Sequence, residues 1–185
     1  MKIGIITYNK YHLKTHQLLS NLSSKNFEIT LILTSFKKFK KRQVFFNHRP
    51  DQFSFKVTNN YLTSNKYKKI CLEDLPEFNY DYILIAGSGL INDKNILKNK
   101  IINCHSGLIP SSRGLDSFKW AIKNLYQIGN TLHYINEKID LGKIISHKIT
   151  KVYKNDNLHK FALRHYNSEI NMLSNFDYYL KKKEI

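Results

Sequence analysis

The first 34 residues follow the order strand, helix, strand, and this order constrains the fold more than any other feature of the chain. Residues Lys2–Thr7 (KIGIIT) form a short apolar run typical of a buried strand. His12–Lys25 carries leucines at roughly helical spacing, and Phe27–Thr34 (FEITLILT) again favours a strand. Strand, helix and strand in succession predict a βαβ unit and therefore a parallel sheet.

The turn after the first predicted strand excludes two common nucleotide-binding motifs. A dinucleotide fingerprint or a P-loop needs glycines directly after this strand, where the backbone approaches the phosphates. The sequence there is Thr7-Tyr8-Asn9-Lys10, which contains no glycine.

The rest of the chain continues the alternation after a less regular segment, residues 36–65. We expect strands at 81–86, 101–105, 130–136 and 144–152, and helices at 92–98, 117–126 (with Asp116 as N-cap) and 155–183. Neither an internal repeat nor a Pro- or Gly-rich linker interrupts the pattern. This predicts an α/β fold in one domain, residues 1–185, with a core over about 1–150 and a closing C-terminal helix at 155–183.

Composition and the lengths of the apolar runs indicate the cellular compartment in which we expect the protein. With 42% hydrophobic residues among 185, a packed core is expected. The longest apolar runs fall far short of the ~20 residues that a membrane-spanning helix needs, and the first run is too short for a secretory leader. Two cysteines, Cys71 and Cys104, do not make a disulfide framework. We therefore expect a cytoplasmic protein with reduced thiols and no membrane partner.

The formal charge of +16 invites a nucleic-acid interpretation, but its make-up weakens that interpretation. Of the 30 cationic residues 26 are Lys, beside 20 Asn and 22 Ile, which is the bias that an AT-rich genome produces without any ligand. A cluster of basic residues at 37–42 is expected to be solvated surface. Arg49, next to His48 and Pro50 in a loop, could meet a phosphate through its bidentate fork. The charge favours anionic ligands in general, and we do not expect nucleic acid as a partner.

Three polar residues are candidates for catalysis. Asn103 and His105 lie two apart on a predicted strand, so their side chains share one face while Cys104 points to the other. They stand at the carboxyl end of that strand, where open parallel sheets place ligand sites. Asp140 lies in a predicted turn just before Gly142.

An Asn, a His and an Asp that converge on one cleft suit acyl transfer. The amide can donate to a carbonyl oxygen as it becomes an oxyanion. The imidazole can stabilise that charge or carry a proton, and a carboxylate can orient the imidazole. A nucleophilic Ser or Cys in a recognisable elbow is missing, which favours direct transfer without a covalent enzyme intermediate. From spacing alone, a purely structural His–carboxylate pair is the alternative.

These residues resemble the motifs of the folate-dependent formyltransferases. The run from Asn103 to Pro110 (NCHSGLIP), followed by Arg113-Gly114 and Trp120-Ala121-Ile122, is similar to that family's Asn-x-His segment. Residues 129–133 (GNTLH) resemble its Gly-x-Thr-x-His strand, and residues 139–145 (IDLGKII) resemble its Asp-x-Gly turn. The resemblance covers roughly residues 81–150.

The resemblance implies a Rossmann-like three-layer formyltransferase fold, with a mostly parallel central sheet and helices on both faces. It implies 10-formyltetrahydrofolate as co-substrate and no metal. Asn103 would hold the formyl oxygen, His105 would stabilise the tetrahedral intermediate, and Asp140 would orient His105 and help to remove the amine proton. The implied folate-binding residues are Ala86, Gly87, Ser88, Gly89, Leu90, Ile135, Ile139 and Gly142. Candidate acceptor-binding residues are Lys10, Arg49, Ser106, Gly107 and Arg113.

The family's branches differ in the amine that they formylate. The glycinamide ribonucleotide branch has a glycine-rich phosphate loop after the first strand, which this chain lacks. The methionyl-tRNA branch adds a C-terminal barrel, for which the roughly 35 residues after position 150 offer no room. We therefore expect a small stand-alone N-formyltransferase acting on a small anionic amine, namely a nucleotide-linked amino sugar. The alternatives are a phosphoribosylglycinamide formyltransferase, a non-catalytic folate-binding protein and a basic nucleic-acid-binding protein. The oligomeric state, homodimer included, and the role of residues 36–65 stay open.

Overall fold

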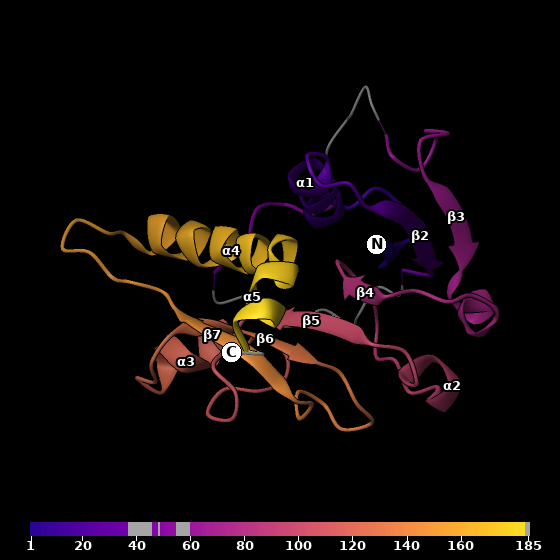
Figure 1. The fold of residues 1–185 in the computed structure, drawn as a ribbon. Helices are drawn as coiled ribbons and strands as arrows, with labels where there is room; N and C mark the ends of the chain where they lie inside the picture. Colours follow the sequence, from indigo (N-terminus) through magenta and orange to yellow (C-terminus); the bar gives the residue numbers. More distant parts are fainter. Residues whose placement is uncertain (37–45, 48, 55–59, 184–185) are drawn as a thin grey trace. The chain divides into compact units, whose positions relative to one another are not determined.

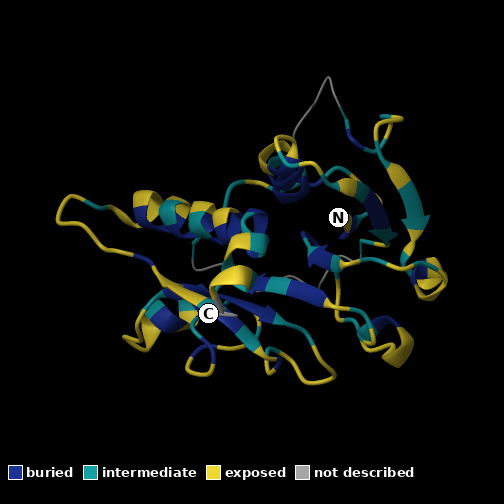
Figure 2. Cartoon of the chain, in the orientation of Figure 1, coloured by how far each residue is buried: buried dark blue, intermediate teal, exposed yellow. Residues whose placement is uncertain are grey.

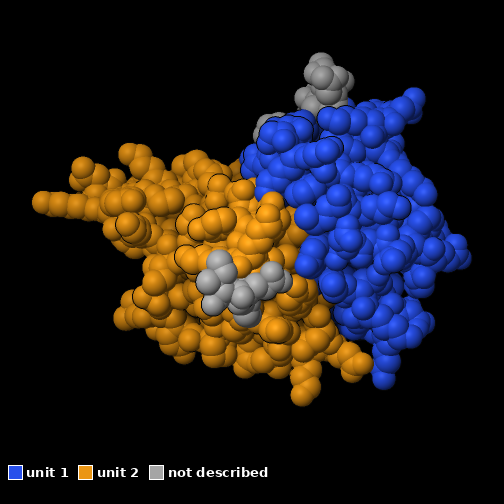
Figure 3. Space-filling model, viewed as in Figure 1, with its two compact units in different colours: residues 1–45, 51–101 blue, residues 46–50, 102–185 orange. Residues whose placement is uncertain are grey.

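A computed structural model describes residues 1–36, 46–47, 49–54 and 60–183 of the chain. The basic cluster at 37–42 and His48 lie outside these described residues. Contacts divide the chain into two compact units (Figure 3): unit 1 comprises residues 1–45 and 51–101, and unit 2 comprises residues 46–50 and 102–185. The single domain that we expect over residues 1–185 stays a prediction.

Unit 1 contains a parallel sheet, as the opening of the sequence predicts. Its strands are β1 (Lys2–Tyr8), β2 (Glu28–Thr34), β3 (Lys68–Cys71) and β4 (Tyr82–Ile85). They lie in the order β3-β2-β1-β4, and each pairing among them is parallel (Figure 1). The isoleucines of β1 are fully buried, because a central strand of a parallel sheet is covered on both faces. This explains the continuous apolar run at the start of the chain.

Helix α1 (Leu13–Leu22) connects β1 to β2 and completes the predicted βαβ unit. Its leucines at helical spacing are buried, which is the reason for their periodicity. Unit 1 also contains a 3-10 helix, η1 (Leu72–Glu77), and the short helix α2 (Lys94–Leu97), which Asp93 caps through the amides of Asn95 and Ile96.

Unit 2 contains antiparallel strand pairs, whose positions the sequence analysis does not predict. Its strands are β5 (Ile101–His105, of which 102–105 belong to this unit), β6 (Gly129–Tyr134) and β7 (Ile144–Ile149). Both pairings, β5 with β6 and β6 with β7, are antiparallel. The connection between β6 and β7 is short and has no helix, and a connection of this kind permits only an antiparallel return.

The predicted single helix at 155–183 is wrong, because the chain breaks at Asn175 into α4 (Leu158–Ser174) and α5 (Phe176–Lys183). The backbone of Asn175 leaves the helical region, and its side-chain amide donates to the carbonyl of Asn171. Helix α4 packs against β6 and α5 against β7. Figure 2 shows α4 with one buried and one exposed face. Within the described ranges, no helix combines the length and apolar character needed to cross a lipid bilayer.

Helix α3 (Ser117–Lys123) begins where predicted and ends earlier than predicted. It stops because Leu125 takes a positive φ of 57°. Asp116 occupies the N-cap position, but its side chain makes no capping hydrogen bond and lies instead 3.3 Å from the Lys119 ammonium. Phe118 anchors α3 by stacking on His165 of α4, with ring centroids 4.5 Å apart. This packing holds α3, which follows the segment after β5, against α4.

Candidate active site

The carboxyl end of β5 presents Asn103 and His105 on one face, as the strand alternation predicts. Cys104, between them, points to the opposite face and is 2% exposed. In the antiparallel register with β6, Asn103 lies opposite His133 and His105 opposite Thr131. The side chains of His133 and Thr131 therefore lie on the same face of the sheet as those of Asn103 and His105.

The structure brings His105 and Asp140 together. The Nδ1 atom of His105 lies 3.4 Å from Oδ2 of Asp140. Its Nε2 atom lies 3.0 Å from the carbonyl oxygen of Ser112. A neutral imidazole carries one N–H and an imidazolium carries two, so only the imidazolium donates to both oxygens at once. The ring is buried, and this geometry makes it a fixed donor beside a carboxylate.

Asp140 is held in the connection between β6 and β7 with a positive φ of 50°. The backbone turns tightly here, and a Cβ at Gly142 would lie only 1.7 Å from the carbonyl oxygen of Tyr134. The Tyr134 amide donates to the Lys143 carbonyl across the same turn at 3.0 Å. Glycine is therefore required at position 142 so that the turn can present the carboxylate.

His133 is a second histidine at the site, and the sequence analysis does not assign it there. Its Nε2 lies 3.7 Å from Oδ1 of Asp140 and 3.5 Å from the side-chain nitrogen of Asn103. Its Nδ1 donates to the Tyr134 carbonyl at 2.8 Å. Burial lowers the pKa of His133, while that hydrogen bond and the charge of Asp140 oppose the shift. In its neutral form the ring accepts the Asn103 amide through Nε2. The Gly-x-Thr-x-His motif is the sequence signal that could have placed it here.

The segment after β5 is tied to β6 by Thr131. Its hydroxyl donates to the Gly107 carbonyl at 2.7 Å and accepts the Ile109 amide at 3.1 Å. A Cβ at Gly107 would lie 2.5 Å from the Ser112 carbonyl oxygen and 2.9 Å from Nε2 of His105. The Ser106 carbonyl accepts the Ser117 hydroxyl. Ser106 and Gly107, two of the five predicted acceptor-binding residues, thus engage neighbours in unit 2, and their role toward an acceptor stays a prediction.

Two arginines of unit 2, Arg49 and Arg113, are predicted to bind the acceptor, and their surroundings differ. Arg49 donates to Glu169 at 2.7 Å, and the Glu169 side chain is only 1% exposed. Arg113 is exposed, and its guanidinium has no hydrogen bond or ion pair with the residues that the structure describes. Its neighbour Gly114 donates its amide to Oδ2 of Asp140 at 2.8 Å. Arg113 is therefore a cation on the segment that contacts the Asp140 carboxylate.

The predicted folate-binding residues of unit 2 surround Asp140 along the chain. Ile139 is 59% exposed, Ile135 is partly buried and Gly142 is buried. Within the described ranges, no group of three or more His, Cys, Asp or Glu side chains is arranged to hold a metal ion.

The other predicted folate loop, residues 86–90, lies in unit 1 directly after β4. The amides of Ala86 and Gly87 both donate to the Ile6 carbonyl. A Cβ at Gly87 would lie 2.7 Å from the Tyr8 ring, and the Tyr8 hydroxyl donates to the Ser88 carbonyl. Gly89 and Leu90 are exposed. The loop is thus buried at its start and exposed from Gly89 onward.

Lys10 lies after the carboxyl end of β1 in unit 1. Its ammonium sits 4.5 Å from the centroid of the Phe36 ring and 4.3 Å from that of Phe53. Both contacts are close enough for cation–π attraction. The side chain is exposed, so this cation is held in a defined place at the edge of the sheet where ligands of parallel sheets bind.

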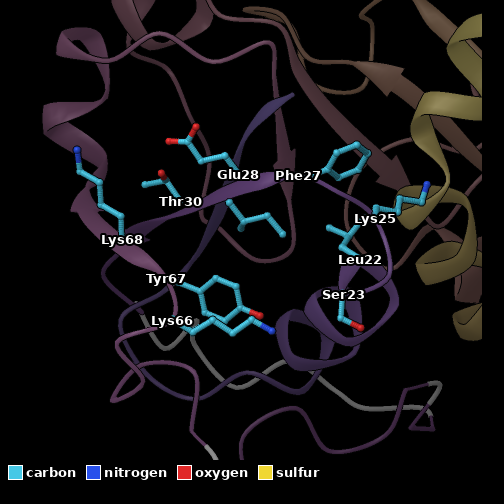
Figure 4. A pocket seen from close by; sticks show the side chains of 10 residues that line it. Leu22, Ser23, Lys25, Phe27, Glu28, Thr30, Lys66, Tyr67 and Lys68 are labelled. Carbon is cyan, nitrogen blue, oxygen red and sulfur yellow. The ribbon is translucent and has the colours of Figure 1, made fainter.

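A hollow of about 310 Å³ lies elsewhere in unit 1 (Figure 4). Its lining comes from the end of α1, from β2 and from the start of β3: Leu22, Ser23, Lys25, Phe27, Glu28, Ile29, Thr30, Lys66, Tyr67 and Lys68. These residues lie toward the amino ends of β2 and β3, the edge opposite to the one where parallel sheets bind ligands. The hollow therefore takes no part in the candidate site.

Comparison with known proteins gives a consistent family. The family model described as formyl transferase matches residues 1–176. Formyltetrahydrofolate deformylase 2, mitochondrial, of Arabidopsis thaliana is 31% identical over 112 residues, which are 57% of this chain and 34% of that protein. The chain thus spans about a third of the length of this curated relative.

Two solved structures share the fold. Phosphoribosylglycinamide formyltransferase from Campylobacter jejuni has a TM-score of 0.69 at 18% identity, covering 97% of each chain. The formyltransferase PseJ from Anoxybacillus kamchatkensis, in complex with UDP-4,6-dideoxy-4-formamido-L-AltNAc and tetrahydrofolate, has a TM-score of 0.60 at 19% identity, covering 98% of this chain and 77% of that one. These likenesses confirm the predicted α/β fold class.

Proposed function

Because the chain belongs to the formyl transferase family, we propose that it transfers a formyl group from 10-formyltetrahydrofolate to the primary amine of a small anionic acceptor. The observation that carries this proposal is the meeting of His105 with Asp140, beside Asn103, inside unit 2. An amide donor, an imidazole and a carboxylate at one strand end are the groups that direct acyl transfer uses.

The reaction joins the acceptor nitrogen to the formyl carbon. As the new C–N bond forms, the formyl oxygen becomes negatively charged, and the Asn103 amide donates to it. The contact between Asn103 and His133 orients that amide. The His105 ring lies on the same face of β5 and stabilises the charge of the tetrahedral intermediate. When the bond from the formyl carbon to the folate nitrogen breaks, the folate nitrogen takes up a proton and tetrahydrofolate leaves.

Asp140 accepts the proton of the attacking amine in this proposal. Its carboxylate faces His105 through one oxygen and His133 through the other. It orients His105 and receives the proton that the attacking amine loses, directly or through water. The amine must be neutral to attack, so formyl transfer decreases at low pH.

The acceptor that we propose is a nucleotide-linked amino sugar. The exposed guanidinium of Arg113, which lies in unit 2 with His105 and Asp140, suits its phosphate groups. The PseJ structure was solved with a formylated sugar nucleotide, which supports this class. Glycinamide ribonucleotide is the second candidate, because the C. jejuni enzyme named for it matches this chain along nearly its whole length. Neither Cys71 nor Cys104 is in a disulfide among the described residues, which fits a reaction in the reducing cytoplasm.

The test is a transfer assay on the purified full chain. The protein is incubated with 10-formyltetrahydrofolate and, separately, a UDP-linked 4-amino sugar, glycinamide ribonucleotide or no acceptor. Mass spectrometry detects the formylated amine, and absorbance follows tetrahydrofolate. A formylated sugar nucleotide supports the proposal. Formate release without an acceptor would show hydrolysis, the activity in the name of the Arabidopsis relative, and would overturn transfer. Folate binding without turnover would indicate a non-catalytic binding protein.

Variants of β5 then test the residue roles. Asn103→Ala and His105→Ala are expected to lower formyl transfer by about 100- to 1,000-fold, the usual effect of losing an oxyanion donor. Cys104→Ala is the matched control, because its side chain lies on the opposite face of the same strand. It should stay within a few-fold of wild type. Wild-type-like activity in Asn103→Ala and His105→Ala would contradict the assigned roles.

A further inference from the structure

We propose that Gly114 is a positioning residue for Asp140, acting through its backbone amide. This inference rests on the proposed function, because it concerns the carboxylate that we propose as the acceptor of the amine proton. The Gly114 N–H donates to Oδ2 of Asp140 at 2.8 Å. The same oxygen lies 3.4 Å from His105, so one carboxylate oxygen is shared by the loop amide and the catalytic ring.

The glycine is needed for its backbone angle and not for space. Gly114 has a φ of +80°, a region that residues with a side chain rarely adopt. A Cβ built on it would meet no atom within 4 Å. Gly107 and Gly142 are the opposite case, since a Cβ on either would collide with backbone. What position 114 requires is therefore the left-handed backbone that aims its N–H at Asp140.

The bond joins two segments in which the side chains next to Asp140 and Gly114 are largely exposed. Beside Asp140, Ile139 is 59% exposed and Leu141 is 44% exposed. Beside Gly114, Leu115 is 62% exposed and Arg113 is exposed as well. Since apolar packing at these neighbours is weak, a hydrogen bond to a charged oxygen is a major restraint on where the carboxylate lies. Loss of this bond should therefore affect catalysis more than stability.

Two substitutions at one position separate backbone angle from side-chain volume. Gly114→Val should displace the amide, because a β-branched residue strongly disfavours a positive φ. Gly114→Asn is the matched control, because Asn tolerates the left-handed region and the site has room for it. We expect Gly114→Val to lower kcat by 10- to 100-fold with KM nearly unchanged, and Gly114→Asn to stay within about threefold of wild type. Equal losses in both variants, or wild-type activity in Gly114→Val, would overturn the proposal.

A double substitution tests whether Gly114 acts through Asp140. In an Asp140→Asn background, Gly114→Val should lower kcat by less than twofold more, because the carboxylate that it positions is already gone. If the two losses multiply, Gly114 acts independently and the proposal fails.

An NMR measurement distinguishes this proposal from the proposed function. Hydrogen exchange at the Gly114 amide should be at least tenfold faster in Asp140→Ala than in wild type, whether or not the protein transfers formyl groups. Unchanged exchange would refute the contact even in an active enzyme. Faster exchange in Asp140→Ala than in wild type, together with a wild-type protein that is inactive with every acceptor, would preserve the contact and refute the proposed function.

Discussion

Adding a single methyl group at Gly142 should disable the site. The Cβ of Gly142→Ala would start 1.7 Å from the Tyr134 carbonyl oxygen and 2.6 Å from its carbon. Real Cβ atoms essentially never approach another heavy atom closer than 3.0 Å, so the two backbone segments must separate by more than 1 Å. The colliding atoms are main chain and cannot rotate away as a side chain could.

The displacement acts on Asp140, two residues earlier in the same turn. A shift of about 1 Å at a catalytic group costs roughly 100-fold in rate, so we expect kcat for formyl transfer to decrease by about that factor. The hydrogen bond from Tyr134 to Lys143 should weaken as well, and overpacking costs about 1–3 kcal/mol. The free energy of unfolding should therefore decrease by a similar amount.

The assay compares kcat and urea denaturation of Gly142→Ala with those of Lys143→Ala. Lys143 is exposed in the same turn, and its substitution leaves the backbone hydrogen bond in place. Circular dichroism confirms that each variant is folded at the assay temperature. If folded Gly142→Ala kept kcat within threefold of wild type, the turn would not be the device that places Asp140.

Three further predictions concern stability. Thr131→Val keeps the shape of the side chain but leaves the buried Ile109 amide without its hydrogen-bond acceptor. The free energy of unfolding measured by urea titration should therefore decrease by about 2 kcal/mol. An unchanged urea midpoint would contradict this expectation. Burial lowers the pKa of His133 in the folded protein below its value of about 6.5 in the unfolded chain. As the pH decreases below about 6.5, the unfolded chain is therefore protonated at His133 before the folded protein is. The free energy of unfolding is highest above this pH and decreases as the pH approaches the lower pKa of the folded state. Denaturation at pH 7.5 and pH 5.5 should show this loss, and His133→Asn should reduce the difference; an identical pH dependence in both proteins would rule out His133 as its source. Arg49→Met removes the guanidinium from the buried Glu169 carboxylate and should lower the free energy of unfolding by about 2 kcal/mol, since Arg49 is itself a third exposed. Glu169→Gln in the same chain should recover part of that loss in thermal denaturation, and no recovery would point to another origin.

Local patterns in the sequence predict the parts of the site that lie on one strand. Asn103 and His105 share a face because strand side chains alternate, and this is visible in the sequence alone. His133 could not be placed in the same way. Its position opposite Asn103 depends on the antiparallel register of β5 and β6, and that register is a property of the folded chain.

Long-range pairings and weak local signals account for the other differences. Arg49 suggests a phosphate ligand by its surroundings in the sequence, while its observed partner Glu169 lies far along the chain. Strand β3 (KKIC) is partly exposed and carries lysines, so it has no apolar run to reveal it. The break at Asn175 depends on side-chain hydrogen bonds that compete with the helix, which residue periodicity does not register.

The alternation along β5 also bears on how such a chain can evolve. Ile102 and Cys104 are buried at 0% and 2% exposure, and Leu132 of β6, opposite Cys104, is fully buried as well. On the other face stand the polar side chains of the site. Mutations that preserve volume can therefore accumulate on the core face without altering the polar side chains of the candidate site. Related proteins can diverge widely in sequence here and still retain the same chemistry.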